Sequence, residues 1–335
     1  MIRKRAWSLV PVMLVLALVA TACGDDDDDP AVGGGQTTET TLGRPTFPSD
    51  STMAKIQAKG RIVVGTRFDQ PGLGQKNPLT NEVEGFDVEI SKIVAAAIFG
   101  GRPADATRYM EFRETTSPNR EAFLENGTVD IVVATYTIND ARKRRVDFAG
   151  PYYVAAQDIL VRADDNSIRQ ASDLAGKRVC SVRNSTPAQR IREMVPQAQL
   201  IEFDTYSLCK DELLANRADA VTTDDAILIG FASENPRALK VVGNRFSTEP
   251  YGIGIAKPGG QPDDVFRDFI NDVLERSYQD GTWKAAFDST LGKSGISVPQ
   301  PPPVDRYAST AAAATTTSST TATSTTSTTT TTTTP

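Results

Sequence analysis

The chain has 335 residues, a formal net charge of −6, three cysteines and no histidine. Because Ser-His-Asp triads, Cys-His pairs and zinc sites that contain histidine need an imidazole, the composition excludes these classes of enzyme and metal site. The length allows about two domains, and the lack of a domain-wide basic charge argues against a nucleic-acid partner.

Residues 1–22 have the parts of a signal peptide, with basic side chains at positions 3–5 and an apolar stretch at 9–20. Cys23 follows and ends the string LVATAC, which resembles the lipobox of bacterial lipoproteins, although Ala20 stands where Leu or Val is usual. The resemblance implies that Cys23 becomes a lipidated N-terminus on the extracellular face of the cell membrane. An ordinary secretory signal and an uncleaved anchor are the alternatives.

Two terminal segments are expected not to fold. Residues 23–50 contain the acidic run at 25–29 with many Gly and Pro, and bury almost no apolar surface, which predicts a flexible tether. Residues 299–335 begin with a Pro-rich interruption at 299–303 and continue as Ala, Ser and Thr alone over 308–334. This composition predicts disorder, as a passive spacer or an O-glycosylated tail.

Between these segments, strand and helix patterns alternate, which predicts the α/β class. RIVVGT at 61–66 and IVVAT at 131–135 are predicted strands, the second buried on both faces. Apolar residues at spacings of three and four predict a helix over 86–98. A serine and a proline at 117–118 predict a helix start, and Gly127 lies near its end.

A second unit begins after residue 153. Strands are expected at 159–161, 178–182, 218–222 and 241–242, and helices at 187–195, 208–216, 226–232, 263–279 and 282–291. The order of these elements predicts a second lobe, residues 156–249, inserted into a first lobe made of 51–155 and 250–298. Two chain crossings, near 154–158 and 246–251, would then form a hinge.

Cys180 and Cys209 remain once Cys23 is assigned to lipid. In an oxidising compartment the two can form a disulfide, and two separate buried thiols are the alternative. Their spacing excludes a CxxC redox or metal motif.

The string TYTINDARKRRVDFAGPYY at 135–153 resembles the signature of family 3 of the bacterial extracellular solute-binding proteins, the polar amino-acid receptors of ABC transporters. GTRFDQPGLG, EGFDVEI, VTTDDAIL and DGTW extend the resemblance over roughly residues 55–292, and it is strongest to the glutamate-binding lipoproteins of actinobacteria. It implies a two-lobed, periplasmic-binding-protein-like fold of type II. Each lobe would be a mixed sheet flanked by helices, and the lobes would close on a ligand.

The resemblance assigns Arg142 to the ligand α-carboxylate, because a planar guanidinium can donate two parallel hydrogen bonds to it. Thr137 matches a donor to the same group or a contact of the α-amine, and Thr135 matches a further polar contact. The alternative for Arg142 is a solvated charge in the basic run at 142–145.

Asp224 matches the aspartate that pairs with the ligand ammonium, while its neighbour Asp225 is a candidate helix cap. Thr186 matches a position where helix N–H groups meet the α-carboxylate. An ordinary N-cap is the alternative for Thr186, and Ser185 is the neighbouring polar candidate.

Arg67 and Arg120 match arginines that face the distal carboxylate in receptors for acidic amino acids. Burying such cations is costly without an anion in return, which favours glutamate. Arg183 and Tyr206 are further candidates for the distal group, and Phe68 could pack over the ligand or belong to the core or rim.

The sequence thus predicts a monomeric, lipid-anchored receptor that binds glutamate, then aspartate, and delivers it to an ABC permease. Glutamine is the alternative ligand, and a membrane signalling partner is the alternative to the permease. No cofactor or metal is expected. An enzyme is not expected, because the nucleophile, P-loop and dinucleotide motifs are absent and adjacent aspartates at a strand end point apart.

Overall fold

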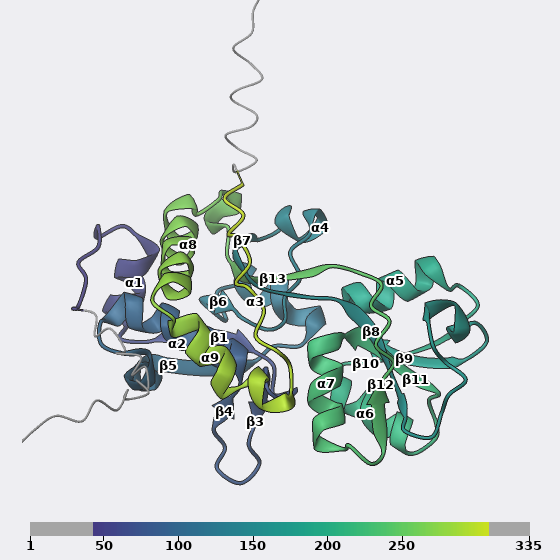
Figure 1. The fold of residues 1–335 in the computed structure, drawn as a ribbon. Coiled ribbons are helices and arrows are strands. Elements are labelled where there is room, and N and C mark those ends of the chain that lie inside the picture. The colour runs from purple at the N-terminus through teal and green to yellow at the C-terminus, as the bar shows by residue number, and fades with distance from the viewer. Residues whose placement is uncertain (1–42, 308–335) are drawn as a thin grey trace, which may run out of the picture. The chain divides into compact units, whose positions relative to one another are not determined.

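The computed structural model describes residues 43–307 (Figure 1). The predicted signal peptide, Cys23, most of the tether and the Ala/Ser/Thr tract lie outside the described residues. Within residues 43–307, no helix combines the length and the apolar character that a bilayer span requires.

The first lobe is built on a five-stranded sheet in the order β5-β1-β6-β13-β7. Its strands are β1 (Ile62–Thr66), β5 (Met110–Glu114), β6 (Ile131–Val132), β7 (Asp147–Ala155) and β13 (Glu249–Ile255). Strand β1 runs parallel to β5 and β6, whereas β13 pairs antiparallel with β6 and β7. The helices of this lobe are α1 (Thr52–Lys59), α2 (Phe86–Phe99), α3 (Arg120–Glu125), α4 (Asp140–Lys143), α8 (Asp264–Gln279) and α9 (Thr282–Ser289).

The second lobe is built on a five-stranded sheet in the order β10-β9-β11-β8-β12. Its strands are β8 (Gln157–Arg162), β9 (Arg178–Val182), β10 (Gln199–Phe203), β11 (Ala220–Asp224) and β12 (Leu239–Val241). Strand β9 is parallel to β10 and β11, and β8 is antiparallel to β11 and β12. Its helices are α5 (Thr186–Met194), α6 (Tyr206–Leu214) and α7 (Asp225–Glu234). Mixed sheets flanked by helices confirm the predicted fold class.

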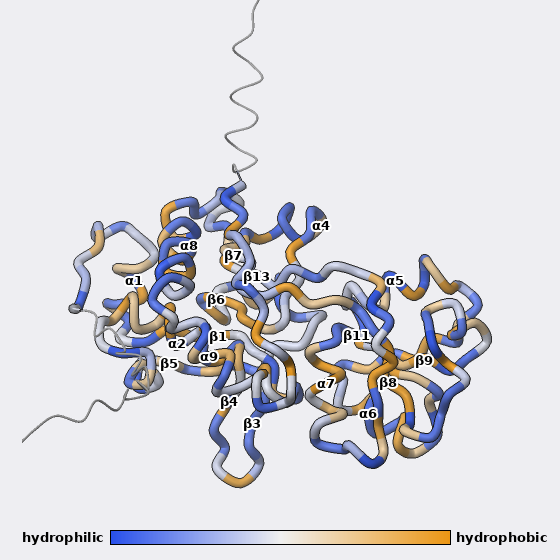
Figure 2. The backbone as a smooth tube through the Cα atoms, viewed as in Figure 1, coloured by the Kyte–Doolittle hydropathy of each residue, from blue (hydrophilic) through white to orange (hydrophobic). Residues whose placement is uncertain are grey.

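The chain leaves the first sheet after β7, enters the second at β8, and returns between β12 and β13. Apolar residues run along β1, β6 and β8, as expected of strands covered on both faces (Figure 2). The exact lobe boundaries given above stay a prediction.

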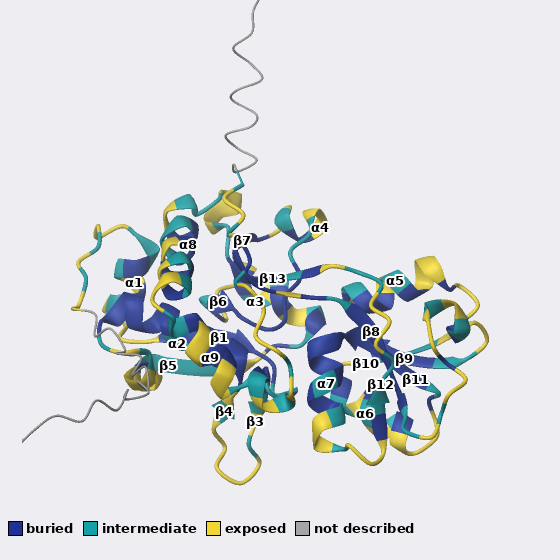
Figure 3. Ribbon diagram, in the orientation of Figure 1, coloured by how far each residue is buried: buried dark blue, intermediate teal, exposed yellow. Residues whose placement is uncertain are grey.

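A small three-stranded sheet follows β1 and was not predicted. It consists of β2 (Asp69–Gln70), β3 (Gly74–Lys76) and β4 (Val83–Glu84). The strands are two or three residues long, too short for any alternation of polar and apolar residues to stand out. The hairpin between β3 and β4 is exposed at its tip (Figure 3).

The predicted strand at 131–135 is wrong beyond residue 132. Strand β6 has only two residues, and Thr135 has a φ of 46°. The Thr135 N–H donates to the carboxylate of Asp87 on α2 rather than to a neighbouring strand. The segment after the strand is thus bonded to a residue 48 positions earlier, a contact that an apolar run cannot reveal.

An aromatic cluster fixes α2. The ring of Phe86 lies 5.7 Å from the rings of Trp283 and Phe287 and 6.0 Å from that of Tyr152. The Trp283 indole donates to the Tyr152 carbonyl at 2.9 Å, which ties α9 to β7. Such aromatic pairs add about 0.5–1.5 kcal/mol each beyond their burial. The cluster therefore fixes the start of α2, where Asp87 follows Phe86.

The predicted disorder from Pro299 is wrong for residues 302–307, here called the C-terminal strap. Pro302 is buried, and Val304 packs against the core. The Asp305 N–H donates to the Gly150 carbonyl at 2.8 Å, and the Tyr307 hydroxyl accepts from the Phe148 N–H at 2.9 Å. Because β7 is an edge strand of its sheet, the strap supplies partners to backbone groups that the sheet leaves free.

Candidate functional site

A small pocket contains polar side chains from both lobes. The first lobe contributes Arg120, Thr135 and Thr137, and the second contributes Ser185, Thr186, Tyr206, Thr223 and Asp224. Several buried polar atoms here have no hydrogen-bond partner within the described residues, namely Arg120 Nε, Thr223 Oγ1 and Asp224 Oδ1. Such groups are costly to bury alone, so their concentration at one place indicates a polar ligand that both lobes contact.

Arg120 provides the positive charge of the pocket. It begins α3 and is 3% exposed, and its Nη2 donates to the Ala134 carbonyl at 2.6 Å. It forms no ion pair with any carboxylate among residues 43–307. Burial, together with the charges of Arg142 and Arg67, lowers its pKa to about 10, so the side chain stays cationic at neutral pH. A buried cation without a counter-ion favours an anionic ligand group.

Arg67, at the end of β1, is also buried, but a carboxylate already balances its charge. Its Nε donates to Asp69 Oδ1 at 2.8 Å, and its Nη2 lies 2.7 Å from the same oxygen. Arg67 is not among the side chains that line the pocket. Of the two arginines predicted for the distal carboxylate, Arg120 is therefore the one with unbalanced charge.

Arg142 lies in α4 and is 8% exposed, which rules out the alternative of a solvated charge. Its Nη1 donates to the Thr137 carbonyl at 2.5 Å, and its Nε lies 3.7 Å from a Glu121 oxygen. The guanidinium carbon lies 4.9 Å from the centre of the Tyr136 ring, as does that of Arg120. Tyr136, which sequence reasoning missed, thus holds two cations beside the pocket through cation–π contacts.

Thr135 has a left-handed backbone, a conformation that costs a β-branched residue about 1–3 kcal/mol. Its N–H donates to Asp87 Oδ2 at 3.0 Å and its hydroxyl to Gln70 Oε1 at 3.3 Å. Asp87 also accepts from the Tyr152 hydroxyl at 2.7 Å. Burial raises the pKa of Asp87 to about 6, although these hydrogen bonds favour its ionised form.

Sequence reasoning also missed Asp87 and Gln70. Both side chains are fully buried. The available signal was a polar residue at 87 between the apolar residues Phe86 and Val88 at the start of a helix.

Asp224, at the end of β11, contributes a carboxyl group to the pocket. It is 3% exposed, and its Oδ2 accepts from the Tyr251 hydroxyl at 2.6 Å. Burial, together with the nearby charges of Glu249 and Asp225, raises its pKa to about 8. A ligand ammonium beside Oδ1 would lower this pKa and give the carboxylate a counter-ion.

The neighbours of Asp224 and the start of α5 have separate roles. Asp225 accepts from the Ala226 N–H at 2.8 Å and pairs with Arg245 at 2.6 Å. Ser185 is the N-cap of α5, since its Oγ accepts from the N–H of Ala188 at 3.1 Å. The alternative that Thr186 is an ordinary N-cap is therefore wrong, and its hydroxyl instead donates to Glu249 at 2.9 Å.

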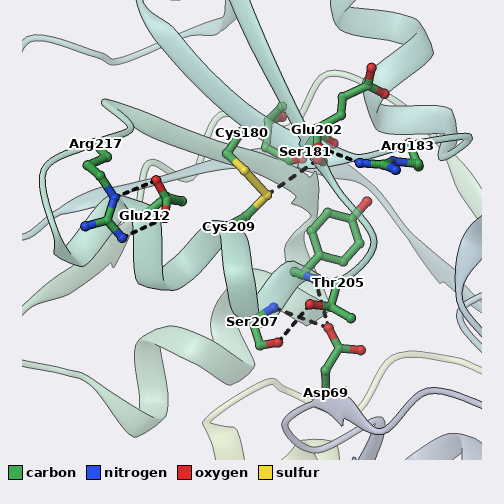
Figure 4. The surroundings of a disulfide bond; sticks show 12 residues. Asp69, Cys180, Ser181, Arg183, Glu202, Thr205, Ser207, Cys209, Glu212 and Arg217 are labelled. Atoms are coloured by element: carbon green, nitrogen blue, oxygen red, sulfur yellow. Dashed lines mark hydrogen bonds and ion pairs between the residues drawn. A yellow bond between two sulfur atoms is a disulfide. The ribbon is translucent and has the colours of Figure 1, made fainter.

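The structure brings Tyr206 to the pocket but not Arg183 or Phe68. Tyr206 is 3% exposed and lines the pocket. The side chain of Arg183 is 50% exposed, because it pairs with Asp204 at 3.2 Å and donates to the Glu202 carbonyl (Figure 4). The Phe68 ring faces a separate surface groove, with Lys76 Nζ 5.5 Å from its centre.

The predicted disulfide is confirmed, which excludes two separate thiols. Cys180 on β9 and Cys209 on α6 are bonded, with their Cα atoms 5.4 Å apart, and both are fully buried. The bond fastens α6, the helix that begins with Tyr206 (Figure 4).

Comparison with known proteins gives consistent matches over most of the residues that the structure describes. The sequence profile of the bacterial extracellular solute-binding proteins, family 3, matches residues 62–293. The glutamate-binding protein GluB of Corynebacterium efficiens is 40% identical over 262 residues, which are 76% of this chain and 87% of that protein. A glutamine-binding protein of Geobacillus stearothermophilus is 36% identical over 261 residues, 76% of this chain and 95% of that protein.

A solved structure is similar as well. An ancestral arginine-binding protein bound to glutamine is 32% identical, with a TM-score of 0.63, and the match covers 70% of this chain and 98% of that one.

Proposed function

The chain belongs to family 3 of the bacterial extracellular solute-binding proteins. We propose that it binds an acidic amino acid, with higher affinity for glutamate than for aspartate, and delivers it to a membrane ABC permease. The observation that carries this proposal is that one pocket holds a buried guanidinium and a buried carboxyl group, each with one polar atom that has no hydrogen-bond partner within residues 43–307. Arg120 Nε and Asp224 Oδ1 are these atoms. An amino acid with an acidic side chain supplies a partner to both.

The pocket favours one orientation of such a ligand. The ammonium pairs with Asp224 and the distal carboxylate with Arg120. The α-carboxylate then faces Thr137, Arg142 and the N-terminus of α5, where helix N–H groups favour an anion. Because these groups come from both lobes, the ligand stabilises the arrangement in which the lobes are together, and closure follows as a shift of populations.

Glutamine is the second candidate ligand, since relatives are named for both amino acids. It would satisfy Asp224 in the same way but would leave the charge of Arg120 unbalanced. The geometry of Arg120 therefore favours glutamate.

Calorimetric titration of the chain from residue 24 onward with glutamate, aspartate, glutamine, asparagine and arginine tests the proposal. We expect glutamate to bind at least about tenfold more tightly than glutamine, a difference of roughly 1.4 kcal/mol. Arg120→Gln should remove this preference, and Arg113→Gln, an arginine whose side chain is 57% exposed, should keep it. Tighter binding of glutamine or arginine by the unmodified chain would refute the acidic ligand.

The proposal includes the lipid anchor at Cys23 and a location on the extracellular face of the membrane. The string LVATAC before the described residues supports it. A Cys23→Ala variant should appear in the culture medium, whereas the unmodified chain should stay with the membrane fraction. Equal release of both would refute the anchor.

The proposal is of a receptor rather than an enzyme. Asp225, the one carboxylate adjacent to Asp224 in sequence, is engaged by Arg245 and by the first turn of α7. It is therefore not free to act with Asp224 as an acid and base pair. Incubated ligand should be recovered unchanged.

A further inference from the structure

We infer that Asp69 is a positioning residue of the ligand site, because its single carboxylate joins Arg67 of the first lobe to the N-terminus of α6 in the second. The inference rests on the proposed function, in that the pocket binds an amino acid between the lobes. Asp69 itself is not among the residues that line the pocket.

The first contact crosses between the lobes. Asp69 lies on β2, directly after β1, and its side chain is 8% exposed. Its Oδ2 accepts from the Tyr206 N–H at 2.8 Å and from the Ser207 N–H at 3.2 Å. Figure 4 shows the carboxylate turned toward this first turn of α6. Asp69 thus caps a helix that begins 137 residues later in the chain.

The start of α6 gives independent support. The first N–H groups of a helix have no partner within it and are usually satisfied by the residue at the N-cap. Thr205 occupies the N-cap here but makes no side-chain bond to the helix backbone, and its hydroxyl accepts from Ser207 Oγ at 3.1 Å. The cap that its own sequence does not provide comes from the other lobe.

The second contact concerns charge. Asp69 Oδ1 binds Arg67, which also reaches the Asp204 carbonyl just before α6, at 3.5 Å. Asp69 therefore balances the positive charge of Arg67 and leaves that of Arg120 for the ligand. One residue thereby affects both closure and the preference among ligands.

The surrounding surfaces are closely packed. The β2–β3 turn packs against α7, where a Cβ added to Gly230 would lie 2.4 Å from the Pro71 carbonyl oxygen. The Cys180–Cys209 disulfide holds α6 to β9, so a displacement of Tyr206 is resisted from within the second lobe. Separation of the lobes would break both bonds from Asp69 to α6. Capping and ligand binding therefore favour the same arrangement.

Two substitutions separate the two contacts. Asp69→Asn keeps an oxygen that can cap α6, since asparagine is a good N-cap, but removes the charge that balances Arg67. Asp69→Ala removes both. Asp263→Ala is the matched control, because Asp263 caps α8 within the first lobe by accepting from the Phe266 N–H at 3.0 Å.

The experiment combines calorimetry with glutamate and glutamine and amide hydrogen exchange at Tyr206 and Ser207, on the chain from residue 24 onward. Asp69→Ala should weaken the binding of both ligands by about two- to thirtyfold, the range expected for a lost helix cap. It should also speed hydrogen exchange at the amides of Tyr206 and Ser207. Asp69→Asn should retain glutamine binding and increase the preference for glutamate. Asp263→Ala should lower the melting temperature with both dissociation constants unchanged.

Unchanged exchange and unchanged affinities in Asp69→Ala would overturn the inference while the proposed function stands. Equal loss of affinity in Asp263→Ala would also overturn it, since Asp69 would then act only through stability. If the unmodified chain bound neither amino acid, the proposed function would fail, and amide exchange in Asp69→Ala would still decide whether Asp69 caps α6.

Discussion

The affinity for an amino acid should depend on pH through Asp224. In the ligand-free protein, burial and the charge of Glu249 raise the pKa of Asp224 to about 8, so the carboxyl is mostly protonated at pH 7. A ligand ammonium needs the ionised form. Binding must therefore release a proton, about 0.9 per ligand at pH 7 if the pKa of the complex is well below that pH.

The size and direction follow from this linkage. Below pH 8 the apparent dissociation constant should decrease by about tenfold for each unit of rising pH, which corresponds to roughly 1.4 kcal/mol per unit. Between pH 6 and 8 the dissociation constant should therefore change by about fiftyfold. Above pH 8 the affinity should become constant.

The same shift has the opposite sign for the stability of the ligand-free protein. A carboxyl with a raised pKa in the folded state holds its proton at a pH where the unfolded chain has lost it. The stability of the ligand-free fold should therefore decrease as pH rises from about 4 to about 8. Saturating ligand should reduce this loss, because the ammonium stabilises the ionised carboxylate.

Calorimetry at pH 7 in buffers of different ionisation enthalpy measures the released proton directly. Asp224→Asn should bind more weakly, with an affinity and an enthalpy that vary little with pH and buffer between pH 6.5 and 8. A dissociation constant of the unmodified chain that stays constant from pH 6 to 8, with an enthalpy independent of buffer, would refute the role of Asp224 as the ammonium partner.

Three further substitutions or truncations test other parts of the site and fold. Arg142→Ala should weaken the binding of every amino acid by more than about thirtyfold, since losing one partner of a buried charge pair costs roughly 2–5 kcal/mol. Substitution of its exposed neighbour, Arg144→Ala, should leave the titrations unchanged, and equal effects of the two substitutions would contradict the site. Gly230→Ala should weaken the binding of all ligands by roughly 1–3 kcal/mol, because the added Cβ would overlap the Pro71 carbonyl of the other lobe. Unchanged titrations would show that the lobes need not approach at this position. Truncation after Tyr307 should leave the melting temperature unchanged, whereas loss of the whole C-terminal strap should lower it by roughly 5 °C or more. Equal melting curves for the two truncated chains would disprove that the strap stabilises the fold.

Much of the fold could be predicted because the signals are local. The helix from Phe86 has an apolar face and glycines at its end, and the strand at Ile62 is a compact apolar run. Strands β5 and β10 were missed because none of their residues is fully buried and both contain charged residues, three in β5 and one in β10. The C-terminal strap was missed because its proline-rich composition resembles that of a tail, while its bonds to β7 depend on the position of an edge strand.

The site was predictable at the level of residue types and not at the level of partners. Motif positions placed Arg120, Thr137 and Asp224 in the set that the pocket brings together. Arg183 has the same chemistry as Arg120, but an ion pair with Asp204 holds it at the surface. Spacing along the chain does not show which arginine meets a carboxylate, because the partner is chosen by folding.

In the proposed function, this difference in partners is the source of the selectivity for an acidic side chain. Arg67 is balanced by Asp69, and Arg142, 3.7 Å from Glu121, faces the α-carboxylate that glutamate and glutamine share, so neither charge distinguishes these two ligands. Arg120 has a carbonyl oxygen and an aromatic ring as its neighbours, which stabilise a cation less than a carboxylate does. A ligand with a neutral side chain would leave this buried charge uncompensated, whereas a distal carboxylate would compensate it. Under the proposed function, the choice between glutamate and glutamine therefore depends on a single unbalanced guanidinium rather than on the number of arginines near the pocket.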